Sequence, residues 1–190
     1  MADPFRILGI AGSLRRDSHN GAVLRAASEL LPDGAALETY DELGLLPHYN
    51  EDDDTGERPA AVREFYERVA AVDALLVVTP EYNGSVPGVL KNALDWASRP
   101  YGSSVLMAKP ALVIGASTSP FAAAWAREHA RKALQLSGAR PYESGYGVGK
   151  VDTKRSASGV FEDATDLDAL RELFASFVAG SLLPVPDDDF

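Results

Sequence analysis

The chain has 190 residues, 46% of them hydrophobic and 24% charged, with a formal net charge of −10 and no cysteine. This length suits a single domain over residues 1–190, and the missing cysteine excludes disulfides, thiolate metal sites and cysteine nucleophiles, as is common in a reducing cytoplasm. The acidic balance disfavours nucleic acid as a partner, and because no apolar run resembles a signal peptide or approaches the roughly 20 residues of a membrane span, we expect a cytoplasmic protein.

The first predicted strand is the short apolar run of residues 5–11, and a helix with regular apolar spacing follows Asn20. The loop between them, GSLRRDSHN, carries hydroxyl and amide donors and two cations: Ser13, Ser18, Asn20, Arg15 and Arg16. Since the first amides of a helix are free and favour an anion, this loop is predicted to hold a phosphate. It lacks the Gly-Lys-Ser/Thr of a Walker loop and the GxGxxG of dinucleotide folds. The alternative is that Ser18 or Asn20 only caps the helix.

A second, weaker strand is predicted over residues 36–40, and the loop after it contains the acidic run of residues 51–54. Contiguous carboxylates on a loop are usually solvated, and no partner ligand stands near them. The three histidines, His19, His48 and His129, also lack the spacing of metal ligands. We therefore expect no metal site.

A helix that opens at Pro59 leads to the third strand, residues 75–79, a continuous apolar run typical of a strand covered on both faces. A second loop separates this strand from a helix that is predicted from Pro87 to Ser98. It comprises Pro80, Glu81, Tyr82, Asn83 and Gly84. Ligands of open α/β sheets lie beyond the carboxyl ends of strands, and backbone amides and carbonyls in such a loop suit the edge of a planar heteroaromatic ring. The alternative is a tight connection with no ligand.

The rest of the chain supplies two more strands and two helices. The fourth strand is predicted over residues 110–115, and a third loop, ASTSPFAAAW, leaves the same edge of the sheet before a helix that ends near Gly138. Residues around Tyr142 can form a short fifth strand, and residues 145–159 are predicted to be a mobile loop. Thr165 or Asp166 is expected to cap the last helix, and the tail DDDF is expected to be frayed.

Five strands alternating with helices predict a parallel sheet covered on both faces, which is a three-layer α/β sandwich. We expect the strand order 2-1-3-4-5, because its switch point lies between strands 1 and 3, from which the first two loops leave. A receiver domain shares this order but needs acidic residues at the end of strand 1, where this chain has Gly12 and Ser13. A low-molecular-weight phosphatase needs a cysteine, which the chain lacks.

The stretches GSLRRDSHN and PEYNGSVPGVLKNALDWASR resemble the two signature stretches of the NADPH-dependent FMN reductase family, a flavodoxin-like group that includes bacterial chromate and quinone reductases and some azoreductases. A weaker resemblance covers most of the chain, including LGLLPHYNEDDD. It implies that the first loop binds the FMN phosphate through Ser13, Arg15, Ser18 and Asn20. It implies that the second loop holds the isoalloxazine ring, mostly by backbone, along Pro80, Glu81, Tyr82 and Asn83. The third loop has Pro120, Phe121 and alanines where relatives carry glycines, and Ser117 is the contact expected there.

The resemblance implies an enzyme in which FMN accepts a hydride from NADH or NADPH and passes electrons to a quinone, chromate, an azo compound or a similar acceptor. A single shallow crevice would serve both substrates in turn, so ping-pong kinetics are expected. Hydride transfer needs no side-chain acid or base, and no catalytic residue is named. Two alternatives stay open, a flavodoxin-type electron carrier that docks on proteins and an FMN-binding relative without reductase activity.

A homodimer, possibly paired into a homotetramer, is expected on two grounds. Trp96 beside Leu94 and Ala97 gives the helix after the second loop more apolar surface than the sheet obviously covers. The family resemblance also implies dimers whose partner chain helps to wall the flavin pocket, with Tyr82 or the loop around Tyr101 as candidate contacts. The alternative is that Trp96 belongs to the core.

Overall fold

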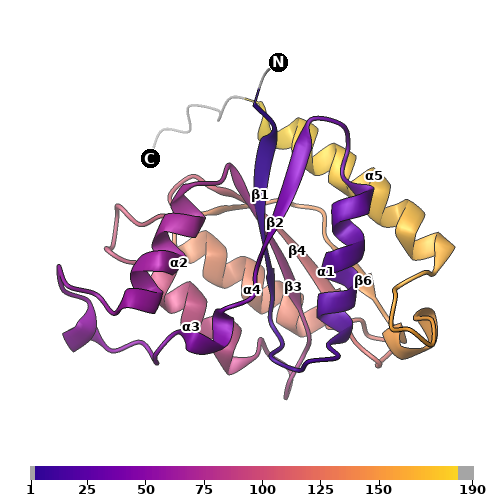
Figure 1. The fold of residues 1–190 in the computed structure, drawn as a ribbon, viewed down its shortest axis with the longest axis horizontal. Helices are drawn as coiled ribbons and strands as arrows, with labels where there is room; N and C mark the ends of the chain where they lie inside the picture. Colours follow the sequence, from indigo (N-terminus) through magenta and orange to yellow (C-terminus); the bar gives the residue numbers. More distant parts are fainter. Residues whose placement is uncertain (1–2, 184–190) are drawn as a thin grey trace.

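The structure is a computed structural model, and it describes residues 3–183. One parallel sheet has the strand order β2-β1-β3-β4-β5, and β6 pairs with the end of β4 that β5 leaves free (Figure 1). The strands are β1 (Phe5–Ala11), β2 (Ala35–Tyr40), β3 (Ala74–Thr79), β4 (Pro110–Ala116), β5 (Arg140–Pro141) and β6 (Tyr146–Val148). The predicted order 2-1-3-4-5 is confirmed, with two short strands sharing the fifth position.

Helices cover both faces of this sheet, as predicted for a flavodoxin-like sandwich (Figure 1). The α-helices are α1 (His19–Leu30), α2 (Ala60–Ala70), α3 (Gly88–Ala97), α4 (Ala124–Leu136) and α5 (Ala164–Ser181). Short 3-10 helices are η1 (Leu43–Leu45), η2 (Glu51–Asp53) and η3 (Val151–Lys154). Helices α1 and α5 pack on one face, and α2, α3 and α4 pack on the other. The fold class expected from the sequence is therefore the fold observed.

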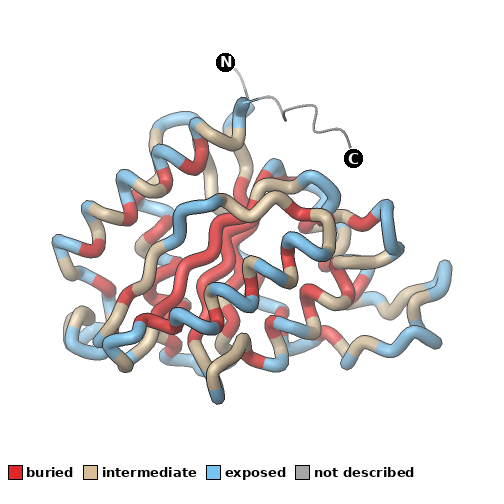
Figure 2. Tube along the Cα trace, turned by 180° about the vertical axis from the view of Figure 1, so that it is seen from behind, coloured by how far each residue is buried: buried red, intermediate tan, exposed pale blue. Residues whose placement is uncertain are grey.

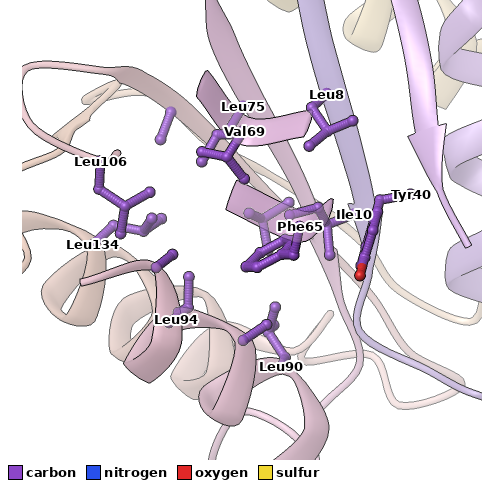
Figure 3. Close-up of a cluster of buried hydrophobic side chains, with 14 of the residues drawn as sticks. Leu8, Ile10, Tyr40, Phe65, Val69, Leu75, Leu90, Leu94, Leu106 and Leu134 are labelled. Atoms are coloured by element: carbon purple, nitrogen blue, oxygen red, sulfur yellow. The ribbon is translucent and has the colours of Figure 1, made fainter. Parts of the chain in front are cut away.

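Strand β3 lies at the centre of two hydrophobic clusters, and all six of its residues are buried (Figure 2). Its side chains alternate between the faces, so that Leu75 and Val77 pack under α2, α3 and α4 while Leu76 and Val78 pack under α1 and α5. Figure 3 shows the first of these clusters, in which Leu75 lies with Leu90 and Leu94 of α3 and Phe65 of α2. Burial of this apolar surface supplies the main free energy that holds the layers together.

Helix α3 differs from the prediction at its start and in the surroundings of Trp96. Pro87 is the N-cap residue with φ of −58°, and the helix proper begins one residue later. Trp96 is fully buried, and its ring Nε1 donates a hydrogen bond to the carbonyl oxygen of Pro47 at 2.8 Å. Its ring also meets Tyr49 edge to face, with 4.9 Å between centroids. Trp96 and the 3% exposed Leu94 thus belong to the core, and the interface proposed for them from the sequence was wrong.

The segment predicted as a mobile loop, residues 145–159, contains strand β6 and helix η3 instead. Strand β5 pairs only with Pro110 and Ala111, so the last three residues of β4 need another partner, and β6 pairs with them. Gly147 of β6 has no side chain for a physical reason, because a Cβ there would lie 2.7 Å from the Cβ of Ala122. Gly147 and Gly149 therefore permit close packing of this segment against the third loop.

The last helix begins earlier than predicted. Asp163 is its N-cap, and the Asp163 carboxylate accepts the backbone N–H of Asp166 at 3.0 Å. Asp166 itself is buried and accepts hydrogen bonds from the Tyr146 hydroxyl at 2.8 Å and from Lys154 Nζ at 2.6 Å. Burial and the neighbouring Asp166 raise the pKa of Tyr146 to about 12. Asp166 thus ties α5 to β6 and η3, and the tail DDDF lies outside the described residues.

Candidate functional site

Three loops leave the carboxyl ends of β1, β3 and β4 at the same edge of the sheet, the lower edge in Figure 1. The first two flank the switch point of the sheet, because β1 and β3 are neighbours while β2 lies on the outer side of β1. Side chains connect the loops directly: Asn20 from the first loop reaches Ala116, and Glu81 from the second reaches the start of α4. The three predicted loops therefore form one site.

The first loop presents free backbone donors at the start of α1. The Ser18 hydroxyl caps the helix by accepting the N–H of Gly21 at 3.2 Å. Among the described residues, the backbone N–H groups of residues 16–20 find no hydrogen-bond acceptor. Arg15 and Arg16 are exposed, and Arg15 Nη2 donates to the carbonyl oxygen of Asp17 at 3.1 Å, which keeps its guanidinium at the loop. Free amides, a helix N-terminus and two arginines together suit an anion.

Asn20 lies beneath this loop, 3% exposed, and its side chain turns inward. Its Nδ2 donates to the carbonyl oxygen of Ala116 at 3.1 Å, directly before Ser117 of the third loop. Its Oδ1 is buried and has no hydrogen-bond partner among the described residues. The side chain therefore links the first and third loops. Asn20 can offer an anion at the start of the helix its backbone N–H but not its side-chain amide.

The second loop contains a two-residue hairpin at Asn83 and Gly84. Tyr82 and Ser85 exchange both backbone hydrogen bonds, at 3.0 and 3.1 Å, and the two residues between them take φ of 52° and 73°. This is the type I′ geometry for which Asn-Gly is the preferred sequence. Thr79 Oγ1 donates to the carbonyl oxygen of Pro80 at 2.8 Å, which fixes the exit of the strand. The tip of the loop is thus rigid, and it holds the Tyr82 ring 49% exposed at the edge of the site.

Helix α4 holds the second loop in place, a role that the sequence did not reveal. One carboxylate oxygen of Glu81, Oε2, accepts the backbone N–H groups of Trp125 at 2.9 Å and Ala126 at 3.1 Å. A Cβ built on Gly84 would lie 3.3 Å from the Trp125 ring, so the hairpin rests on that ring. Ser85 Oγ lies 3.0 Å from Nδ1 of His129. Only the preference of acidic residues for helix N-termini could have suggested the first of these contacts.

The third loop is held by backbone contacts and contains strained residues. Ser117 donates its N–H to the carbonyl oxygen of Val148 at 3.0 Å, and its hydroxyl accepts the N–H of Ser119 at 3.1 Å. Ala122 and Ala123 have φ of 53° and 55°, in the left-handed region that favours glycine. Two alanines of this loop therefore hold backbone conformations that glycine adopts at lower cost. Phe121, which precedes them, is 77% exposed.

Arg155 is a further residue at this site that sequence reasoning missed. Its side chain is 6% exposed, it forms an ion pair with Asp17 of the first loop, and its Nη1 lies 2.9 Å from Nδ1 of His19. The hydrogen bond from Arg155 lowers the pKa of Asp17. Burial, followed by the charges of Arg155 and Arg15, lowers the pKa of His19. No signal in the sequence points to this contact, because Arg155 and His19 are 136 positions apart.

The acidic run of residues 51–54 lies on another part of the molecule. The sequence suggested that its carboxylates are solvated, but the carboxylate of Asp54 is not. The Asp54 side chain is 4% exposed and forms ion pairs with Arg58 and Arg99, each at 2.7 Å. Burial alone would raise the pKa of Asp54, but the hydrogen bonds from Arg99 and Arg58 outweigh it and lower that pKa. Within residues 3–183, no group of three or more His, Cys, Asp or Glu side chains is arranged to hold a metal ion. None of the helices in that range has the length and apolar composition that a membrane span requires.

The family model described as NADPH-dependent FMN reductase matches residues 5–152. An NAD(P)H-dependent FMN reductase of Pseudomonas aeruginosa is 47% identical over 74% of this chain and 75% of its own. A quinone reductase of Pseudomonas putida is 43% identical over 70% of this chain and 72% of its own. The structure of FerB from Paracoccus denitrificans, a flavoenzyme NAD(P)H:(acceptor) oxidoreductase, has a TM-score of 0.81 at 32% identity, covering 93% of this chain and 96% of that one.

Proposed function

The chain belongs to the NADPH-dependent FMN reductase family, and on that premise we propose how it acts as an NAD(P)H-dependent FMN and quinone reductase. One FMN binds per chain at the edge where the three loops meet. NADH or NADPH is the electron donor, and a quinone is the acceptor. Chromate and azo compounds are further acceptors that the sequence resemblance suggests. The site itself supports this proposal through three observations on the loops.

The first loop fits the phosphate of FMN. It combines free N–H groups at the start of α1 with the exposed guanidinium of Arg15, and a phosphate monoester carries about −1.5 to −2 charges at neutral pH. We assign the phosphate to Ser13, Arg15, Ser18 and Asn20. In this arrangement Asn20 contributes its backbone N–H, because its amide group is turned toward Ala116.

The second and third loops fit the isoalloxazine ring. The hairpin tip is rigid and offers backbone groups rather than acids or bases, since the Glu81 carboxylate is committed to capping α4. We assign the ring to Pro80, Glu81, Tyr82, Asn83, Gly84 and Ser117. Fixed backbone amides of this kind stabilise negative charge that develops on a bound ring, and they need no reorganisation during the reaction. The residues assigned to the phosphate and to the ring lie on loops that leave three successive strands of the sheet, β1, β3 and β4, which supports one flavin spanning them.

When it is bound, FMN supplies the hydride and electron transfer, and the protein supplies its position and surroundings. The chain's own task is to orient the ring, to keep one face open for both substrates in turn and to limit water. Tyr82, Phe121 and Trp125 are large, exposed aromatic side chains at this edge of the sheet, and they offer planar surface for a nicotinamide or a quinone. One open face for two substrates leads to ping-pong kinetics.

We also propose the homodimer or homotetramer predicted from the sequence, but on other surfaces than α3. A second chain would pack against the rim that Tyr82, Phe121 and Trp125 form and would close the flavin site, while the ring faces turned toward the site stay free for the substrates. Tyr101, 86% exposed, lies with Met107 and Leu136 along a groove of about 790 Å³ that offers a second face for a tetramer. Light scattering tests this assembly, since a 20.3 kDa monomer with full activity would refute it. Trp125→Glu and Tyr101→Glu then separate the two faces. We further propose that the chain forms a single domain and that the protein is cytoplasmic.

Initial-rate kinetics test the proposed catalytic cycle. NADH or NADPH and a benzoquinone are varied together with FMN-loaded protein. Parallel double-reciprocal lines are expected, because the first product leaves before the second substrate binds. Lines that intersect would mean that both substrates bind at once, and the single open face would then be wrong. If the protein turns over neither NADH nor NADPH, this would instead favour an electron carrier that docks on proteins.

A further inference from the structure

Residues 155–161, between η3 and α5, form an excursion of the chain that contacts the first loop. Residues Arg155 and Phe161 form an antiparallel bridge, and Ser156 donates its N–H to the carbonyl oxygen of Val160 at 2.8 Å. Phe161 on one side of the excursion and Val151 on the other are buried in the core shared by α1 and α5. The position of the Arg155 backbone is therefore fixed by the fold and not by its own side-chain contacts.

The Arg155 guanidinium uses its three nitrogens on three different partners. Nε donates to the carbonyl oxygen of Gly159 at 3.0 Å, Nη1 lies 2.9 Å from Nδ1 of His19, and Nη2 donates to the Asp17 carboxylate. Gly159 has φ of 84°, and a Cβ there would lie 2.6 Å from Nη2, so a side chain at this position would push the guanidinium away. The arrangement thus depends on a glycine as well as on the arginine.

Asp17 and His19 stand immediately before and after Ser18, the N-cap of α1. Arg155 therefore contacts the first loop on both sides of Ser18, the residue at which the helix begins. Asp17 would otherwise place a carboxylate, 76% exposed, beside an anion-binding helix end, where it would repel a phosphate. The ion pair with Arg155 neutralises that charge and turns the carboxylate toward the excursion.

We propose that Arg155 is a positioning residue for the FMN phosphate, which neutralises Asp17 and fixes the start of α1 so that its free amides face the phosphate. This inference rests on the proposed binding of FMN at the first loop. It assigns to Arg155 no contact with the reacting ring, so the effect of the residue is confined to the phosphate end of the cofactor. FMN and riboflavin, which differ in that phosphate alone, separate this role from a general effect on folding.

The test measures dissociation constants of the apoprotein for FMN and for riboflavin by quenching of flavin fluorescence. In Arg155→Ala we expect FMN binding to weaken on the order of tenfold or more while riboflavin binding is unchanged, because the unneutralised Asp17 carboxylate and the displaced start of α1 act against the phosphate, which only FMN carries. Gly159→Ala should act in the same direction with the arginine still present. Arg63→Ala removes the same charge from an exposed site on α2, on the opposite face of the sheet, and should leave both constants unchanged.

Asp17→Asn in the Arg155→Ala background provides the decisive comparison. If Arg155 acts by neutralising Asp17, the double variant should regain much of the lost FMN affinity. A loss of affinity that is equal for FMN and riboflavin would show a structural role only, and unchanged FMN affinity would show none; either result overturns the inference. A wild-type apoprotein that binds FMN no better than riboflavin would instead refute the phosphate site itself, and the inference with it.

Discussion

The carboxylate oxygen Oε2 of Glu81 lies 2.9 Å from the backbone nitrogen of Trp125 and accepts its hydrogen bond. This contact joins the loop after β3 to the first turn of α4, and through it the hairpin at Asn83 comes to rest on the Trp125 ring. A residue that the sequence places in the flavin site thereby also determines how two loops of that site sit against each other.

Removal of the Glu81 cap should destabilise the protein. Glu81→Ala leaves two N–H groups of α4 without their acceptor, and we expect a loss of about 1–2 kcal/mol in the free energy of unfolding. Glu81→Gln keeps an oxygen acceptor and should lose less. Urea denaturation of the apoprotein measures both. Glu128→Ala, an exposed position on the same helix, is the control, and equal losses at the two positions would contradict the capping role.

The left-handed backbone at Ala123 should make a glycine at this position cost less stability than at an ordinary helical position. Ala123→Gly relieves about 1–2 kcal/mol of strain at φ of 55°, which offsets the buried methyl group and the glycine entropy that the substitution costs. Ala126→Gly, buried on the first turns of α4, loses the same methyl group with no such relief. The variant at position 123 should therefore be more stable than the variant at 126 by about 1–2 kcal/mol. Identical stabilities in thermal or urea unfolding would show that the strain is absent.

Trp96 should behave as a core residue. Trp96→Phe removes one of the two donors of the Pro47 carbonyl, the other being Asn92 Nδ2, and leaves space beside Tyr49, so we expect a loss of about 1–3 kcal/mol in unfolding free energy. The control, Trp125→Phe, changes a side chain that is 63% exposed and should alter stability by no more than about 0.5 kcal/mol. Light scattering should give the same mass for wild type and Trp96→Phe. A change in mass without a change in stability would restore the interface role.

Asp54 should make the free energy of unfolding depend on pH in acidic solution. Its pKa is lowered in the folded state, so its contribution to stability is present above the ordinary aspartate pKa of about 3.9 and is lost as the pH falls through the lowered value. Wild type should therefore exceed Asp54→Asn in unfolding free energy at pH 5, and the difference should shrink steadily below pH ~4. A difference that does not change between those conditions would mean that the ion pairs with Arg58 and Arg99 do not shift the titration.

The sheet could be predicted from the sequence because its central strands are largely apolar runs with a loop signal at their ends, as in β1 and β3. Strand β6 could not, since three residues with a central glycine carry no periodicity, and only the unpaired end of β4 creates the need for it. For α3, the apolar stripe showed which residues are buried but not what covers them. The partners of Trp96 are Pro47 and Tyr49, almost fifty positions away, on a loop without regular structure.

The site shows the same division. Its loops were predicted because sheet order alone brings the ends of neighbouring strands together. The inward turn of Asn20, the cap formed by Glu81 and the grip of Arg155 on Asp17 all depend on contacts between distant segments. Asparagine, glutamate and arginine are also common on solvated loops, where they make no such contacts. The residue type alone therefore does not show that these contacts exist. The cofactor residues assigned to each loop stay predictions that binding measurements must test.

The most direct test of the proposed activity follows the visible flavin absorption of the FMN-loaded protein without oxygen. NADH or NADPH is added first, and a benzoquinone is added after the excess nucleotide has been removed. We predict that the absorption is lost with the nucleotide and returns with the quinone, because hydride enters and leaves at the same flavin. An absorption that neither nucleotide changes would contradict the assignment of this chain as an NAD(P)H-dependent reductase.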